Sequence, residues 1–316
     1  MLIRVFLISF LLSLPFWWGI NTLKENLESS FYAQISQPLQ EMSFVKIPEK
    51  PNLDLQAKAA ISVKVNEAGK QKILFKKDIN QPLPIASLTK LMTAVIVLDS
   101  NPPTALQPQP THPKNEYDLS RIITISEKAA AQDDVPVFGN LKSGDKLSVK
   151  ELLELMLIYS SNDAAFALSE VIGTENFVEK MNQKAEILEL ENTHFVNPTG
   201  LDPENLHYDP AVLNYFSYST AKDSVKLTQY ILKEHPLIFE ISIQEPSYLL
   251  ADGIFDLFLT QKVIGGKTGY TDEAGGCILF IFNDDKGNFF INLILGTPSP
   301  SARITEMQKL IDWLML

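Results

Sequence analysis

The sequence predicts an α+β fold: an antiparallel sheet built from N- and C-terminal strands, covered by helices, with a second, helical lobe. Residues 59–65 and 71–75 are rich in β-branched residues and flank a glycine turn, which is typical of a hairpin. Residues 277–282 and 289–295 form a second such pair. An isolated hairpin is marginally stable in water, so we expect the two to join in one sheet. A functional site would then lie in the cleft between the sheet and the helical lobe.

The composition limits the classes of partner. A chain of 316 residues with 45% hydrophobic residues can bury a large core without disulfide bonds. A net charge of −11 argues against nucleic acid as a partner, because phosphate binding needs a basic surface. The lone cysteine, Cys277, lies in an apolar run and is predicted to be buried, and the four histidines are too scattered for a metal site. We therefore expect no metal and no cofactor.

The N-terminal region predicts export. Residues 5–20 are almost wholly apolar, follow Arg4 and include Trp17 and Trp18, which suit a membrane interface. We expect these residues to anchor the chain to the outer face of the cytoplasmic membrane, in the cell envelope; a cleaved signal peptide or a buried helix is the alternative. The predicted divisions are an anchor or signal segment over 1–21, a proline-containing stalk over 22–54 and a folded domain over 55–316.

The first predicted helix starts near Ile85 and continues to Leu98. Pro82 and Pro84 end the strand before it. Its apolar residues lie on all sides, and a helix that is apolar all round is typically buried. We therefore expect this helix to lie in the core.

The middle of the chain predicts helices joined by polar loops. Ser148 and Glu151 form a capping-box pattern at the start of a helix that reaches Ile158. Ser219 is predicted to be the N-cap of a later helix. Further helices are expected over 166–173, 175–186, 219–232 and 299–316, a short strand over 122–125, and loops over 100–119 and 192–202.

A serine followed three residues later by a lysine occurs four times. On a helix this spacing places hydroxyl and amine on one face, where the amine can remove the hydroxyl proton if burial or a second cation lowers its pKa. Only Ser87 and Lys90 lie at the start of the predicted buried helix. The other pairs lie in the stalk, in a turn and at a helix cap: Ser43/Lys46, Ser143/Lys146 and Ser219/Lys222.

Two further short motifs follow in order: Ser160-x-Asn162 and Lys267-Thr268-Gly269. Each has a structural alternative. Ser87 could be a helix N-cap, Ser160 and Asn162 a helix end or turn, and Lys267 a solvated lysine on a strand edge. Together with Ser87-x-x-Lys90 they match the order of motifs in penicillin-binding proteins and serine β-lactamases. The combination therefore favours a catalytic site.

The sequence resembles the D-alanyl-D-alanine carboxypeptidases, the low-molecular-mass penicillin-binding proteins of peptidase family S11. The resemblance covers about residues 59–316 and includes PIASLTKLMTA, NTHFVNPTGLD and GGKTGYTDEAGGC. It implies a peptidase catalytic domain that removes the terminal D-Ala from peptidoglycan stem pentapeptides through an acyl-enzyme, with β-lactams as covalent inhibitors.

The resemblance implies three catalytic residues. Ser87 would attack the penultimate D-Ala carbonyl, and Lys90, as a neutral amine, would take its proton. Ser160 would relay a proton toward the leaving amine.

It also implies a substrate-binding set. Asn162 would orient Lys90 and the substrate amide, while Lys267 and Thr268 would bind the terminal carboxylate. Lys267 would also lower the pKa of Lys90 as a second cation. Gly269 would let the substrate backbone approach the strand, and the backbone N–H groups of Ser87 and Tyr270 would form the oxyanion hole.

Some features depart from the family, and other functions stay open. Ser161 stands where many relatives have glycine, and the 100–119 loop looks longer than usual. A D,D-endopeptidase, a β-lactamase and a catalytically silent wall-binding protein are the alternatives. Because one fold hosts several functions, the site has to decide among them.

Overall fold

The structure is a computed structural model that describes residues 50–66, 69–99, 117–132, 140–206, 215–244 and 262–316. The chain divides into two units, and the second, Pro51–Leu316, contains the helices and strands considered below. The predicted anchor or signal segment over 1–21 lies outside the described residues, as does the stalk up to residue 49. The predicted domain boundaries therefore stay predictions.

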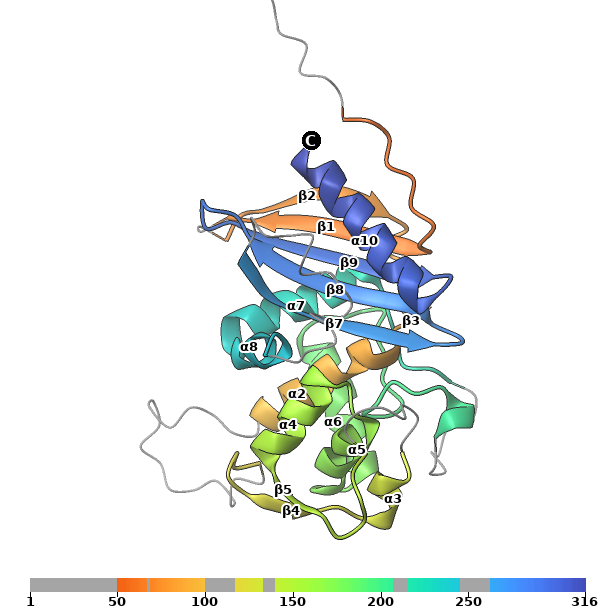
Figure 1. Ribbon diagram of the computed structural model, residues 1–316, viewed down its shortest axis with the longest axis vertical. Helices are drawn as coiled ribbons and strands as arrows, with labels where there is room; N and C mark the ends of the chain where they lie inside the picture. The colour runs from red at the N-terminus through yellow and green to blue at the C-terminus, as the bar shows by residue number, and fades with distance from the viewer. Residues whose placement is uncertain (1–49, 67–68, 100–116, 133–139, 207–214, 245–261) are drawn as a thin grey trace, which may run out of the picture. The chain divides into compact units, whose positions relative to one another are not determined.

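The central sheet has five strands in the order β2-β1-β9-β8-β7, all antiparallel to their neighbours (Figure 1). Strand β1 of the first hairpin pairs with β9 of the second, so the predicted union of the two hairpins is confirmed. The strands are β1 (Ala59–Val65), β2 (Gln71–Lys77), β7 (Lys262–Thr271), β8 (Gly275–Asn283) and β9 (Phe289–Thr297).

Helices cover both faces of this sheet. Helix α10 (Pro300–Met315) packs on one face, where Phe280 and Ile294 meet Leu310 in one apolar cluster. Helices α7 (Ala221–Glu234) and α8 (Leu237–Ser242) lie on the other face, where Leu279 and Leu293 belong to the main core (Figure 1). Side chains alternate across a strand, so neighbouring residues such as Leu279 and Phe280 serve different faces.

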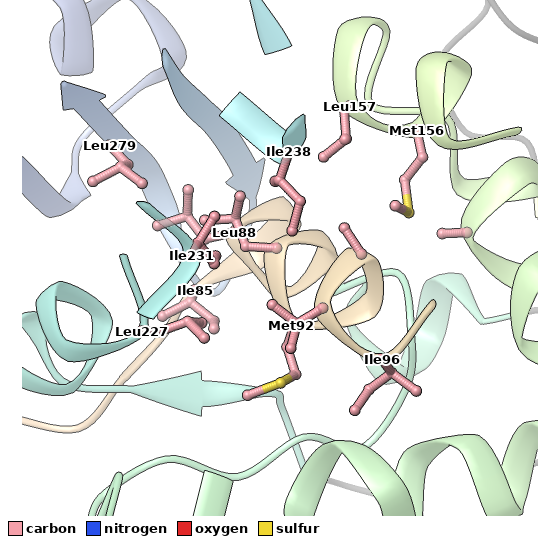
Figure 2. Packing of buried hydrophobic residues seen from close by; sticks show 14 of the residues in the cluster. Ile85, Leu88, Met92, Ile96, Met156, Leu157, Leu227, Ile231, Ile238 and Leu279 are labelled. Carbon is pink, nitrogen blue, oxygen red and sulfur yellow. The ribbon is translucent and has the colours of Figure 1, made fainter. Parts of the chain in front are cut away.

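The helical lobe surrounds helix α2 (Thr89–Asp99), whose side chains from Thr89 to Leu98 are all buried, as predicted. Figure 2 shows Leu88, Met92, Ile231 and Ile238 among the buried apolar side chains of one cluster. The other elements of the lobe are α3 (Glu127–Ala130), α4 (Val149–Ile158), α5 (Asn162–Glu170), α6 (Thr174–Ile187), β4 (Ile122–Thr124) and β5 (Lys146–Ser148).

Two predicted helix caps have different outcomes. Ser148 and Glu151 form the predicted capping box of α4. The prediction for Ser219 is wrong, because the N-cap of α7 is Thr220, whose Oγ1 accepts a hydrogen bond from Asp223 N at 3.0 Å. Ser219 belongs instead to strand β6 (Tyr218–Ser219), which pairs with β3 (Leu83–Pro84). The hydroxyl that caps a helix must directly precede its first turn, and Thr220 holds that place.

Among the described residues, no helix combines the length and the apolar character needed to cross a bilayer. Within the same ranges, no three His, Cys, Asp or Glu side chains gather in a way that could hold a metal ion. Cys277 is buried in the sheet, as predicted, and burial raises the pKa of its thiol to about 11.

Candidate active site

Ser87 and Lys90 meet at the start of α2. Ser87 lies in a single 3₁₀ turn, η1 (Ala86–Leu88), that leads directly into the helix. Lys90 Nζ is fully buried and donates to Ser87 Oγ at 3.0 Å. Ala86 has a φ of 45°, in the left-handed region, which costs a residue with a Cβ about 1–2 kcal/mol. The backbone strain therefore falls directly before the candidate nucleophile.

The second motif lies at the junction of α4 and α5. Asn162 Oδ1 accepts from Lys90 Nζ at 2.6 Å, and Ser160 Oγ accepts from Lys267 Nζ at 2.7 Å. The middle residue, Ser161, caps α5 by accepting from Ala164 N at 3.1 Å. The capping role that was the structural alternative for Ser160 and Asn162 thus belongs to Ser161, and both motif side chains contact the lysines.

The third motif lies on β7, the strand at one edge of the sheet. Lys267 and Thr268 are buried, whereas Tyr270 is 41% exposed. A Cβ added at Gly269 would lie 2.9 Å from Ser87 N, so a residue without a side chain is needed for β7 to pass this close to η1. Arg303 of α10 donates to Gly269 O at 2.9 Å.

The electrostatics of this site favour the neutral form of Lys267. Burial, and then the positive charges of Lys90 and Arg303, lower the pKa of Lys267 well below its ordinary value. The sequence predicted the same repulsion acting in the other direction, from Lys267 on Lys90. Because repulsion between two cations penalises both, protonation of one lysine disfavours protonation of the other. A proton acceptor and a cation can therefore coexist here.

Sequence reasoning missed one contact of Lys90. Its Nζ also donates to the backbone carbonyl of Thr199 at 2.7 Å. Thr199 lies in the 192–202 segment, which was predicted only as a loop. A backbone carbonyl leaves no trace in residue type, so only the run NPTGL at 197–201 could have drawn attention to this position.

Two of the other Ser-x-x-Lys pairs lie in the described part of the chain. Ser143 lies in a turn, as predicted, and Ser219 lies in β6 with Lys222 exposed. Ser43 and Lys46 fall outside the described residues. The structure thus brings all three motifs together around one pair, Ser87 and Lys90. Such an arrangement offers a candidate nucleophile within hydrogen-bonding reach of a candidate proton acceptor, and a second lysine that bonds Ser160.

Comparison with known proteins finds related sequences over most of the chain. A sequence profile of the D-alanyl-D-alanine carboxypeptidases, peptidase family S11, matches residues 45–298. The D-alanyl-D-alanine carboxypeptidase DacF of Bacillus subtilis is 33% identical over 270 residues, or 82% of this chain. This chain spans only 62% of the length of that relative. A D-alanyl-D-alanine endopeptidase of Pseudomonas aeruginosa is 31% identical over 281 residues, which cover 84% of this chain and 81% of the relative.

Solved structures of related proteins have a fold similar to that of this chain. Penicillin-binding protein D2 of Listeria monocytogenes, in its cefotaxime-bound form, has a TM-score of 0.64 at 27% identity. The match covers 84% of this chain and 100% of that one. The carboxypeptidase DacD of Francisella tularensis has a TM-score of 0.65 at 25% identity, over 84% of this chain and 72% of that one.

Proposed function

The chain belongs to the D-alanyl-D-alanine carboxypeptidase family, peptidase family S11, and from this premise we propose that it is a serine D-alanyl-D-alanine carboxypeptidase. It removes the terminal D-Ala from peptidoglycan stem pentapeptides through an acyl-enzyme on Ser87. The observation that carries the proposal is the 3.0 Å contact between Ser87 Oγ and the fully buried Lys90 Nζ. A serine hydroxyl needs an adjacent base, and a buried amine next to a second cation is suited to that role.

The proposed acylation step uses Lys90 as general base. Ser87 Oγ attacks the carbonyl carbon of the penultimate D-Ala while its proton passes to the neutral amine of Lys90. The C–N bond then breaks, and the leaving D-Ala amine receives a proton, relayed by Ser160. Water afterwards hydrolyses the ester and restores the Ser87 hydroxyl. The hydrogen bond of Ser160 Oγ with Lys267 Nζ supports this relay, because it keeps Ser160 connected to the lysine pair.

Lys267 and Thr268 are proposed to bind the terminal carboxylate of the substrate. The lowered pKa of Lys267 supports this role, because an arriving carboxylate would favour the charged form that burial and Lys90 disfavour. A charged Lys267 in turn disfavours protonation of Lys90. Substrate binding would therefore favour the neutral form of Lys90, which is the form that can accept the Ser87 proton.

The proposed oxyanion hole consists of the backbone N–H groups of Ser87 and Tyr270. Gly269 supports this assignment, because its lack of a Cβ lets β7 lie next to Ser87 N. The hydrogen bond from Arg303 to Gly269 O also contacts this stretch of strand.

Endopeptidase activity on cross-linked stem peptides is the second candidate. The similarity to the Pseudomonas aeruginosa endopeptidase supports it. The chemistry at Ser87 would be the same, since both reactions cleave a bond after a D-Ala carbonyl. A cross-linked peptide dimer and a free pentapeptide, offered to the same enzyme, distinguish the two activities.

We also propose that the protein works in the cell envelope, anchored to the outer face of the cytoplasmic membrane by residues 5–20. The apolar run after Arg4 supports this. The test is the distribution of the full chain, and of a chain that lacks residues 1–21, between membrane and soluble fractions. Equal distribution of the two would contradict the anchor.

The full chain in detergent, incubated with a fluorescent penicillin and with a peptide ending in D-Ala-D-Ala, tests the proposed activity. The expected result is a long-lived label on Ser87 and release of free D-alanine. Rapid turnover of the penicillin would indicate a β-lactamase. A parent protein that takes no label and releases no D-alanine would indicate a silent wall-binding protein.

A further inference from the structure

Asn197 is a fully buried residue that lies outside the three motifs and organises the turn after it. Its Oδ1 accepts from Gly200 N at 2.6 Å, from Thr199 N at 3.0 Å and from Thr199 Oγ1 at 2.9 Å. Its Nδ2 donates to Leu201 O at 3.0 Å. One side chain therefore bonds three consecutive residues of the turn, and this fixes the direction of the peptide groups between them.

The turn presents its Thr199 carbonyl to Lys90 Nζ at 2.7 Å. It is also tied to α2 by Thr93 Oγ1, which donates to Pro198 O at 2.7 Å. Lys90 and Thr93 lie three residues apart on α2 and therefore share one face of that helix. The turn thus contacts the helix at two neighbouring points, one of which is the candidate base.

The oxygens around Lys90 differ in whether they carry a hydrogen. Asn162 Oδ1 and Thr199 O carry none, so they can only accept hydrogen bonds. Ser87 Oγ carries the proton that has to be transferred. A neutral amine has two N–H groups and one lone pair. If it donates to Asn162 and Thr199, its lone pair is left for the Ser87 hydroxyl.

We propose that Asn197 is a positioning residue for the acylation reaction: by holding the Thr199 carbonyl, it directs the lone pair of Lys90 toward Ser87 Oγ. Asn197 acts through Thr199 and does not touch the reacting atoms. The inference rests on the proposed function, because it assumes that Lys90 takes the proton of Ser87. A purely structural role for Asn197, in which it only stabilises the turn, is the competing explanation.

Asn292 provides a matched control. It is likewise fully buried, but it lies on β9 in the sheet. Its Oδ1 accepts from Ser62 Oγ at 2.8 Å, and its Nδ2 donates to Phe280 O at 3.2 Å. Truncation of either asparagine leaves buried polar groups without partners and should destabilise the fold. Only Asn197→Ala should change the geometry of the base.

The test is a stopped-flow titration of the full chain with a fluorescent penicillin, which separates the dissociation constant of the first complex from the rate constant of acylation. For Asn197→Ala we expect an acylation rate constant about 10- to 100-fold lower, with little change in the dissociation constant. For Asn292→Ala we expect the parent rate constant. A role confined to folding would lower the fraction of protein that becomes labelled and leave the rate constant of that fraction unchanged.

An Asn197→Ala variant that acylates at the parent rate constant overturns the inference and leaves the proposed function intact. A parent protein that takes no label overturns both. If Asn197→Ala does not fold, Thr199→Val decides in its place. It removes the hydroxyl that bonds Asn197 Oδ1 and accepts from Leu201 N at 3.1 Å, and it keeps the carbonyl. We expect a rate constant about 3- to 10-fold lower for Thr199→Val, and the parent value would overturn the inference.

Discussion

The two ends of helix α2 carry ionisable side chains, fully buried Lys90 and half-buried Asp99, with different kinds of partner. At its start, Lys90 Nζ lies within hydrogen-bonding distance of oxygens of Ser87, Asn162 and Thr199, none of which belongs to a carboxylate. At its end, Asp99 accepts from Lys184 at 2.6 Å, and its other oxygen lies 2.6 Å from His235 Nε2. A cation at a helix N-terminus and an anion at a helix C-terminus both oppose the helix dipole. In these contacts only the anion lies next to a charge of opposite sign, that of Lys184.

The pKa values follow this difference. Burial opposes ionisation of Asp99, but hydrogen bonds from His235, Lys184 and Tyr230 outweigh it and lower the pKa of the carboxyl. Burial likewise opposes the charge on Lys184, but Asp99 raises its pKa above the ordinary value. For Lys267, beside Lys90, burial and the neighbouring cations act together and lower the pKa. The difference teaches that a charge next to one of opposite sign stabilises the fold, whereas burial beside a like charge lowers the pKa of a lysine into a range that suits chemistry.

Replacing Lys90 at the start of α2, or Lys184 near its end, should give the largest difference in acylation rate between the two regions. Lys90→Met should reduce the rate of penicillin acylation by about 10³-fold or more, because the general base is lost. Lys184→Met should leave that rate unchanged and lower the free energy of unfolding by about 1–3 kcal/mol, because Asp99 loses a charged partner. Acylation kinetics and urea unfolding measure the two effects. A Lys90→Met variant that acylates at the parent rate would contradict the catalytic role that separates Lys90 from Lys184.

Two glycines with similar φ angles test how closely the turn at residues 197–201 packs against the residues around Ser87. Gly200 and Gly173 have φ of 83° and 85°, so alanine at either position costs about 1–2 kcal/mol. A Cβ at Gly200 would lie 2.0 Å from Ala86 O, beside Ser87, whereas a Cβ at Gly173 meets nothing within 4 Å. We therefore expect Gly200→Ala to lose more stability than Gly173→Ala and to acylate about 10-fold or more slowly.

Thermal unfolding and penicillin labelling of both glycine variants provide the measurement. Gly173→Ala should acylate at the parent rate, which makes it the control for backbone strain alone. Equal rates for the two variants would mean that the turn does not position Ser87.

The smallest expected effect is the pH dependence of stability. A lowered pKa means that folded Lys267 releases its proton at a pH where the unfolded chain, with a pKa of about 10.4, still holds it. Because the unfolded state then binds more protons, the free energy of unfolding rises with pH toward about pH 10. Lys267→Met should lose this rise.

Asp99 and Lys184 should contribute to the pH dependence of stability in a different way from Lys267. The contribution of Asp99, whose pKa is lowered, is present above about pH 3.9 and is lost as pH falls through its folded value. The contribution of Lys184, whose pKa is raised, is present below about pH 10.4 and is lost as pH rises through its folded value. Lys184→Met should therefore keep the parent slope near neutral pH. Urea unfolding at several pH values tests this, and a flat parent profile would contradict it.

The sequence was informative wherever a function needed a residue type at a fixed spacing. Ser87 and Lys90 could be chosen among four pairs because only they opened an apolar helix, and the hairpins could be found from their alternation. The role of Thr199 could not be found in this way, because it uses a backbone carbonyl. The cap of α7 was misassigned by one residue because Ser219 and Thr220 are both good caps, and the pairing of β6 with β3 decides between them.

Peptide mapping by mass spectrometry, after reaction of the full chain with penicillin, tests the central claim most directly. We predict a single covalent adduct on the peptide that contains Ser87, no adduct in Ser87→Ala, and almost none in Lys90→Met at short reaction times. An adduct on any other peptide, or labelling of Lys90→Met at the parent rate, would contradict the assignment of Ser87 as nucleophile and Lys90 as its base.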